Sequence, residues 1–275
     1  MQTFLPYADF VESARSLDQA RLGKQRVEAL QVLRAIVLPA YGWQSHPAMQ
    51  MWRGYVPALT RYALDTVDTW TSLGRADTTR PLIAEFAPEV DGTTIASLPR
   101  PTWLGNEELH LSHRSNLVRK DPEFYRPLFP GVPGDLPYLW PGPDADAPLS
   151  SAPSGPPLWI IRAGSAGELE AWAGTGSVML AETSPRGRRT PAWQRQLDRF
   201  AELRVGTAIA ALVGNGAVLL GGTIEGRVTS YRGEEDETGL KREVGFDREM
   251  ARAEFPYPAL LQDPRSVFEV PGPGW

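Results

Sequence analysis

Residues 17–33, LDQARLGKQRVEALQVL, predict one amphipathic helix. Its apolar residues recur at the spacing that a buried helix face requires; they are Leu22, Ala29, Leu33 and, just beyond the stretch, Ile36. The polar side carries residues at offsets of three, four and seven; they are Arg21, Lys24, Gln25 and Glu28. One carboxylate among two cations and an amide has two interpretations. This side is either a solvated face with ion pairs, or an anion-binding surface with one acid placed for chemistry.

Composition narrows the class of protein. The chain has 275 residues, of which 42% are hydrophobic and 22% charged, and this suits packed cores in two modest domains. A formal net charge of −5 argues against indiscriminate nucleic-acid binding but leaves room for a local basic groove. The absence of cysteine excludes thiol catalysis, disulfides and cysteine-ligated zinc. With no membrane-length apolar run and no leader, we expect a soluble, cytoplasmic protein without a cofactor.

The first half predicts helices. The first should begin at Asp9 or Ser13 and end at Val37, before Pro39. The pattern is helical again over residues 48–73, where Pro57 should kink the segment or divide it. Another helix is expected over residues 107–120, followed by a short one. Residues 1–140 are therefore expected to form an all-α helical bundle.

The second half begins with a proline-rich stretch and then predicts mostly short strands. Residues 141–157, PGPDADAPLSSAPSGPP, predict a solvated, partly extended linker between two domains. Beyond it, a helix is expected over residues 193–203. Short strands broken by glycine-rich turns are expected at residues 158–164, 177–181, 207–213, 218–224, 227–231, 243–246 and 267–270. Residues 158–275 are therefore expected to form a small α+β domain built on a β-barrel.

All three histidines, His46, His110 and His113, lie in the first half. A three-histidine metal site is conceivable, but the spacing matches no zinc or iron signature, so no metal is predicted. Histidines hydrogen-bonded in a core or groove are the favoured interpretation. In a further interpretation, His113, Arg114 and Asn116 contact phosphate or a base alongside the first helix.

Residues 1 to about 140 resemble the pyrimidine-dimer DNA glycosylase (endonuclease V) family. The resemblance rests on the start of the chain, on the L-D-x(9)-E-A-L frame of residues 17–30, on the His46-Pro47 turn before an aromatic-rich helix, and on the block HLSHRSNLVRKDPEFY. It implies a compact helical bundle with the amino terminus packed in the active site.

The resemblance also implies a bifunctional mechanism. The free α-amine attacks the anomeric carbon of the damaged nucleotide, expels the base and holds the sugar as a Schiff base, and a helix glutamate then assists strand cleavage by β-elimination. The matching acid here is Glu28. Contacts with nucleic acid are expected from Arg21, Gln25, Arg26, His46, His113, Arg114 and Asn116.

Two departures from the family pattern bear on this mechanism. Residue 2 is Gln, so we expect Met1 to be retained and to offer its α-amine as the nucleophile. Lys24, one helical turn from Glu28, is an alternative amine, and water is a third nucleophile. Val27 stands where the family has an arginine, a role that Arg26 or Arg21 is expected to cover. Excision of a modified nucleotide other than a pyrimidine dimer therefore stays open.

The second half resembles PUA-like barrels related to EVE domains. The motifs are LWIIRAG, VLLGGTIEGRVTSY and REVGFDREM, together with the helix expected over residues 193–203. The resemblance implies a pocket for a modified base or an RNA nucleotide. The expected pocket residues are Trp159, Arg162, Trp193 and Tyr231, although the aromatic side chains equally suit a barrel core.

Together these features predict a DNA glycosylase, with or without lyase activity at abasic sites, linked to a reader of modified bases. Such a protein would serve repair or attack on foreign DNA, because linked binding modules raise effective affinity. The expected partner is damaged or modified DNA, with RNA left open and no membrane partner. The alternatives are a non-catalytic nucleic-acid-binding protein on a glycosylase scaffold and an RNA-directed member.

Overall fold

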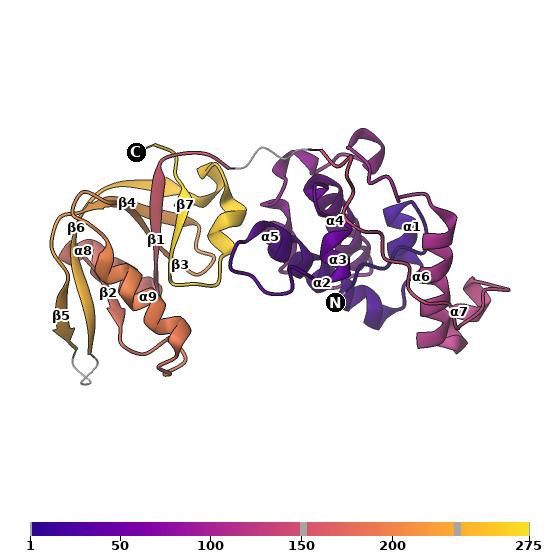
Figure 1. Ribbon diagram of the computed structural model, residues 1–275, viewed down its shortest axis with the longest axis horizontal. Coiled ribbons are helices and arrows are strands. Elements are labelled where there is room, and N and C mark those ends of the chain that lie inside the picture. Colours follow the sequence, from indigo (N-terminus) through magenta and orange to yellow (C-terminus); the bar gives the residue numbers. More distant parts are fainter. Residues whose placement is uncertain (1, 149–152, 234–237, 275) are drawn as a thin grey trace. The chain divides into compact units, whose positions relative to one another are not determined.

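The computed structural model describes residues 2–148, 153–233 and 238–274. The chain divides into two compact units, Met1–Ser151 and Ala152–Trp275, the first carrying helices and the second a sheet (Figure 1). Within the expected linker, residues 149–152 lie outside the described part. Asp144 accepts hydrogen bonds of 2.6 Å from the hydroxyls of Tyr55 and Thr102. This end of the proline-rich segment therefore lies against the first unit.

Helices joined by long irregular segments build the first unit. They are α1 (Phe10–Arg15), α2 (Gln19–Val37), α3 (Pro47–Gln50), α4 (Val56–Ser72), α5 (Arg80–Ala84), α6 (Glu107–Lys120) and α7 (Pro122–Leu128), with short 3₁₀ turns η1 (Pro88–Val90) and η2 (Ile95–Ser97). The helix expected over residues 107–120 is confirmed as α6. Pro57 lies in the first turn of α4, so the helical pattern of residues 48–73 is divided rather than kinked.

The single helix expected up to Val37 is two helices, and Asp18 separates them. Its carboxylate accepts hydrogen bonds from the amides of Ala20 and Arg21 at 2.9 and 3.0 Å, which begins α2 at that point. Within α2, a Cβ atom on Gly23 would lie 2.9 Å from the ring of Trp70. The glycine therefore lets the indole on α4 pack closely against α2.

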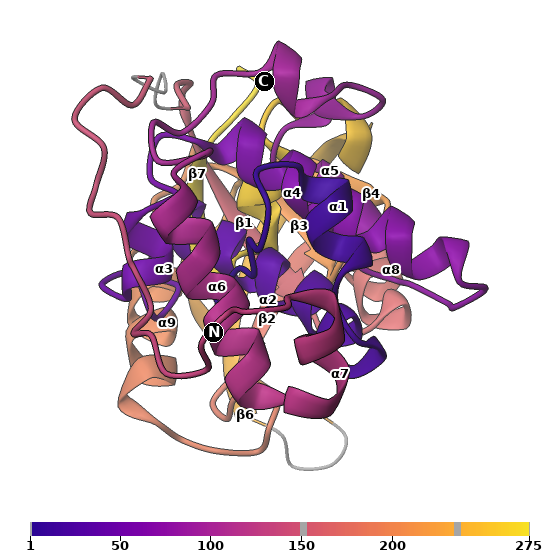
Figure 2. The same cartoon turned by 90° about the vertical axis from the view of Figure 1, so that its right-hand side faces the viewer.

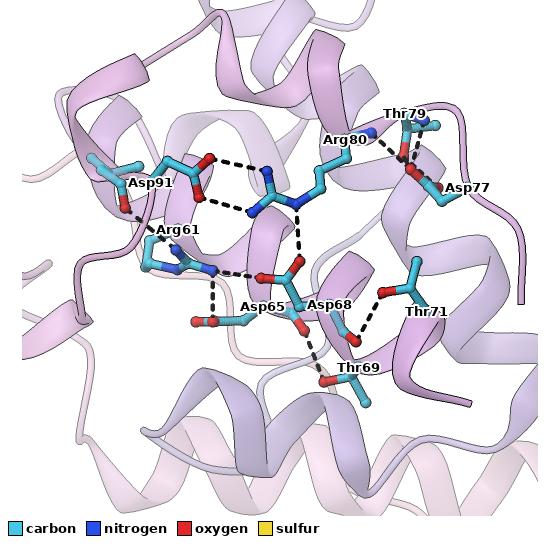
Figure 3. A network of polar contacts seen from close by, with 10 residues as sticks. Arg61, Asp65, Asp68, Thr69, Thr71, Asp77, Thr79, Arg80 and Asp91 are labelled. Atoms are coloured by element: carbon cyan, nitrogen blue, oxygen red, sulfur yellow. Dashed lines mark hydrogen bonds and ion pairs between the residues drawn. The ribbon is translucent and has the colours of Figure 1, made fainter. Parts of the chain in front are cut away.

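A network of ion pairs fixes the helices that flank the core of the first unit (Figure 3). Arg61 on α4 donates to Asp65 at 2.9 Å and to Asp68 at 3.3 Å. Arg80, at the start of α5, donates to Asp68 at 3.0 Å and to both carboxylate oxygens of Asp91. The network ties α5 and the residue after η1 to α4.

The second unit is a mixed sheet with helices on one face. Its elements are β1 (Pro157–Ala163), α8 (Ala166–Thr175), β2 (Ser177–Ala181), α9 (Pro191–Glu202), β3 (Ala208–Val213), β4 (Val218–Ile224), β5 (Thr229–Arg232), β6 (Thr238–Ala251), η3 (Arg252–Glu254), η4 (Pro258–Gln262) and β7 (Val267–Pro271). The strand order is β2-β6-β4-β3-β1-β7, and β5 also pairs with β6. Only the β1–β3 pair is parallel among the described strands. Trp172 of α8 and Phe200 of α9 pack into the core under the sheet.

The predicted fold class, an all-α bundle followed by a small α+β domain on a PUA-like β-barrel, is wrong. The first unit is helical, but residues 129–148 contain no helix, so it is not a plain bundle. In residues 153–233 and 238–274, no pairing joins the edge strands β2 and β7, and the sheet is a curled half-barrel. Closure depends on pairing between distant strands, which the pattern within each strand does not encode.

None of the described helices combines the length and hydrophobicity needed to cross a lipid bilayer.

Candidate active site

A hollow of about 320 Å³ opens beside α2, α6 and the first described residues of the chain. Its lining residues are Gln2, Phe4, Ala20, Arg21, Lys24, Glu28 and Lys120. Four of them are charged, namely one acid and three cations. A concave site with an excess of positive charge attracts an anionic substrate even on a chain whose net charge is −5.

Glu28 is the acid of this hollow and is only 7% exposed. The Nζ atom of Lys24, one helical turn earlier, lies 3.3 Å from Glu28 Oε1, whereas the Lys24 side chain is 73% exposed. The pair follows from the four-residue offset, which puts both side chains on one helix face. A mostly buried carboxylate within reach of a solvent-accessible amine is an arrangement suited to proton transfer.

The first described residues wall the hollow, and side chains from α2, from α4 and from the turn between α3 and α4 hold them there. Gln25, fully buried in α2, accepts a hydrogen bond of 3.1 Å from the Phe4 amide and donates one of 2.9 Å to the Gln2 carbonyl. Tyr62 on α4 donates to the Phe4 carbonyl at 2.9 Å. Trp52 donates from its indole nitrogen to the Thr3 hydroxyl at 3.0 Å.

Helix α6, which faces the viewer in Figure 2, also contacts this segment. His110 Nδ1 lies 2.8 Å from the Leu5 carbonyl oxygen, and His113 Nδ1 accepts a hydrogen bond of 3.2 Å from the Leu5 amide. Arg114 donates to the Pro6 carbonyl at 2.8 Å. A buried backbone group left unpaired costs about 1–3 kcal/mol, so these contacts determine the path of residues 2–7. Met1, the predicted nucleophile, lies outside the described residues.

The buried histidines His110 and His113 form hydrogen bonds with backbone groups. His110 uses its second nitrogen, Nε2, to accept a hydrogen bond of 3.1 Å from the Gly105 amide. Burial lowers the pKa of His113 to about 3, so its ring is neutral at physiological pH. Across the described parts of the chain, no group of three His, Asp or Glu side chains is arranged to hold a metal ion.

The remaining residues expected to contact nucleic acid lie at several places. Arg21 lines the hollow, is paired with Asp18, and lies over the ring of Tyr125 at 5.4 Å from its centroid. Arg26 is outside this lining, paired with Asp77 and stacked on Trp70.

The side chains of Asn116 and His46 form hydrogen bonds with backbone groups of the protein. The amide of Asn116 donates to the carbonyls of Ser112 and Leu136 at 2.8 and 3.2 Å, and its side chain is buried. His46 begins α3 by accepting a hydrogen bond from the Ala48 amide. The structure therefore gathers Arg21, Lys24 and Glu28 around the hollow. Gln25, His113 and Arg114 instead form hydrogen bonds with the segment that walls it.

Lys120 is a site residue that sequence reasoning did not select. It stands in the last turn of α6 and lines the hollow with Glu28. Partial desolvation lowers the pKa of its amine, and the positive charges of Arg21, Arg119 and Lys24 lower it further, against the opposing effect of Glu28. The sequence places Lys120 on a polar helix, but no local pattern brings that helix to α2.

The four residues expected to form a modified-base pocket are not brought together. Trp193 lines a hollow of about 510 Å³ with Arg186 and Arg188, whereas Trp159 lines a separate hollow of about 270 Å³. Arg162, partly buried on β1, donates to the carbonyls of Arg265, Asp263, Leu261 and Gly214. Tyr231 lies on β5.

Comparison with known proteins finds a family that part of the first unit resembles. Residues 1–82, fewer than a third of the chain, match the family described as Pyrimidine dimer DNA glycosylase, which implies glycosylase-like activity at the level of that family. The match includes Lys24 and Glu28 but ends before α6. No curated protein matches the chain in sequence.

Among solved structures, a YTH domain shows a weak similarity to the chain. The YTH domain of the Zygosaccharomyces rouxii MRB1 protein, in complex with N6-methyladenosine RNA, is 12% identical with a TM-score of 0.29, over 42% of this chain and 78% of that domain. A similarity this low supports no inference about the second unit.

Proposed function

We propose that the first unit is a DNA glycosylase that acts at the hollow around Glu28 and cleaves the strand through an amine–sugar intermediate. The observation that carries this proposal is the buried carboxylate of Glu28, 3.3 Å from an amine, in a hollow walled by the first residues of the chain. The family match over residues 1–82 supports the reaction class.

The proposed reaction begins with a neutral amine. Its lone pair forms a bond to C1′ as the glycosidic bond breaks, and the base leaves with the bonding electrons and takes up a proton. The nitrogen then passes a proton to the ring oxygen O4′ as its lone pair forms the C1′–N double bond and the C1′–O4′ bond breaks, which leaves an iminium ion and a 4′ hydroxyl. Loss of a 2′ proton then expels the 3′ phosphate. Glu28 would stabilise the positive charge on the sugar and accept the 2′ proton.

The α-amine of Met1 is the proposed nucleophile. An unperturbed α-amine has a pKa of about 7.7–8.0, which leaves a useful neutral fraction at physiological pH, whereas an ordinary lysine has a pKa near 10.4. The hydrogen bonds of Gln25 to Gln2 and Phe4 support this choice, because they direct the start of the chain to the hollow. Lys24 is the alternative nucleophile, since its amine faces Glu28 directly.

Positive charge around the hollow would bind the DNA backbone. Arg21, Lys24 and Lys120 line it together, and cations of this kind contact phosphates without reading sequence. Substrate choice among pyrimidine dimers, abasic sites and other modified nucleotides would then depend on the shape of the hollow.

Replacing the acid tests the catalytic proposal. Glu28→Gln keeps the size of the side chain but removes its charge, so we expect excision to slow by about 10²–10⁴-fold. Excision is measured on duplexes carrying a pyrimidine dimer or a modified base, and strand cleavage on a duplex carrying an abasic site. Glu12→Gln, an exposed change in the first turn of α1, is the matched control. Excision by Glu28→Gln at the wild-type rate would contradict the assignment, and inactivity of the wild type on every substrate would favour the non-catalytic alternative.

We also propose that residues 158–275 form a separate module that contacts nucleic acid, joined to residues 1–140 through residues 141–157. The hollow with Trp193, Arg186 and Arg188 supports this, because an aromatic ring beside two cations suits a base and its phosphate. Binding of matched modified and unmodified DNA and RNA oligonucleotides tests it. Arg186→Ala with Arg188→Ala should weaken binding, while Arg195→Ala on α9 is the control.

A further inference from the structure

Trp43 combines exposure with a strained backbone. Its side chain is 63% exposed, and its φ of 71° is the one positive value at a non-glycine residue within residues 2–148, 153–233 and 238–274. A bulky residue in this region is an outlier, and a glycine or asparagine would adopt it at lower cost. Folding therefore does not explain an indole here, and strained residues of this kind concentrate at functional sites.

Four hydrogen bonds of Gln44 hold the loop that carries Trp43. The side-chain amide of Gln44 donates to the backbone carbonyls of Leu38 and Pro39 at 3.1 and 3.3 Å. The backbone carbonyl of Gln44 accepts hydrogen bonds from the side chains of Gln50 at 2.7 Å and Arg53 at 3.3 Å. The indole is thus presented on a preorganised loop, and binding through it sacrifices little conformational entropy.

A series of ring contacts connects this loop to the wall of the Glu28 hollow. The ring centroids of Trp43 and His46 are 6.0 Å apart, those of His46 and Trp140 are 6.0 Å apart, and those of Trp140 and His113 are 6.2 Å apart. His113 in turn accepts the hydrogen bond from the Leu5 amide, in the segment that walls the hollow. Neighbouring side chains therefore connect the indole to the wall of the candidate active site.

We propose that Trp43 stacks on a nucleobase of the DNA bound at the Glu28 hollow. This inference rests on the proposed function and adds a DNA-positioning residue that lies outside the hollow. Exposed Arg53 donates to the backbone carbonyl of Gln44, the residue after Trp43, and so adds a cation to the same loop. An exposed aromatic face on a loop that also carries a cation suits a base and its phosphate better than an apolar protein surface.

The test uses the full chain and a duplex with a tetrahydrofuran abasic analogue and 2-aminopurine at neighbouring positions. Stacking on the indole should quench 2-aminopurine fluorescence. Trp43→Ala should remove that quenching and weaken binding roughly tenfold, and Trp43→Phe should restore most of both. Leu73→Ala, at the end of α4 and 59% exposed in the wild type, should bind normally. Thermal unfolding midpoints should show that all three variants are folded.

Equal binding and quenching by wild type and Trp43→Ala would overturn the proposal, as would a Trp43→Phe variant no better than alanine. Borohydride trapping on a natural abasic site separates this result from the catalytic proposal. Trapping without dependence on Trp43 would overturn the stacking role alone, and Trp43-dependent binding without trapping would overturn the lyase alone. A wild type that binds no DNA would overturn both.

Discussion

The side-chain carbonyl of Gln25 accepts a hydrogen bond of 3.1 Å from the amide of Phe4, and the same side chain donates to the carbonyl of Gln2 at 2.9 Å. One buried side chain of α2 thus holds two backbone positions of the first described segment. This pairing links the helix that carries Glu28 to the wall of the hollow, and the proposed chemistry depends on it.

Removing that link should affect catalysis more than binding. Gln25→Ala leaves two backbone groups without their partners, so we expect a loss of about 1–3 kcal/mol in the free energy of unfolding. The start of the chain should then sample other positions, and kcat should fall by more than tenfold with a smaller change in KM. Urea unfolding and steady-state kinetics measure both. Gln31→Ala, elsewhere on α2, should change neither, and a normal kcat for Gln25→Ala would contradict this account.

Stability should depend on pH through His113. Its pKa is about 3 in the folded chain against 6.5 for the unperturbed group, so the unfolded state binds more protons between these values. Stability from the neutral ring is complete above about pH 6.5 and is lost as the pH falls towards 3. His113→Asn, which can still accept from the Leu5 amide, should flatten the slope by up to about 1.4 kcal/mol per pH unit in that window. If the free energy of unfolding changed equally with pH in the wild type and in His113→Asn across that window, this prediction would be wrong.

Lys120 should act on DNA as a cation. Lys120→Met should weaken binding and reduce the salt dependence of the affinity by about one unit in the slope of log K against log salt. Lys120→Arg keeps the charge and should retain most of the affinity. Fluorescence anisotropy across a salt series measures the slopes. If Lys120→Met kept the wild-type slope, Lys120 would have no phosphate contact.

Gly23→Ala should fail to stabilise the protein, although alanine is usually favoured over glycine within a helix. Alanine in a helix interior is worth about 1 kcal/mol relative to glycine. At Gly23 the new Cβ would lie 2.9 Å from the Trp70 ring, so the gain should be lost to displacement of the indole. Gly174→Ala in α8 has nothing within 4 Å of the new Cβ and should stabilise the chain. Thermal unfolding compares the two, and equal stabilisation would show that Trp70 moves freely.

Local sequence patterns predicted where the helices lie better than they predicted how distant segments pack together. Helix α6 follows from the cap at Asn106 and the two glutamates after it, and the shared face of Lys24 and Glu28 follows from their offset of four. The break at Asp18 was missed because the apolar pattern continues through it. Contacts between distant segments decide that the sheet stays open and that Lys120 lines the same hollow as Glu28. Local periodicity does not predict such contacts.

Borohydride trapping on abasic-site DNA, followed by mapping of the modified residue by mass spectrometry, tests the central claim most directly. We expect a covalent adduct on the α-amine at the start of the chain, strongly reduced in Gln25→Ala, whereas Glu28→Gln should strongly reduce strand cleavage, the step that follows the trapped iminium ion. An adduct on Lys24 would keep the lyase and move the nucleophile along α2. The absence of any adduct with the wild-type protein would contradict the amine mechanism.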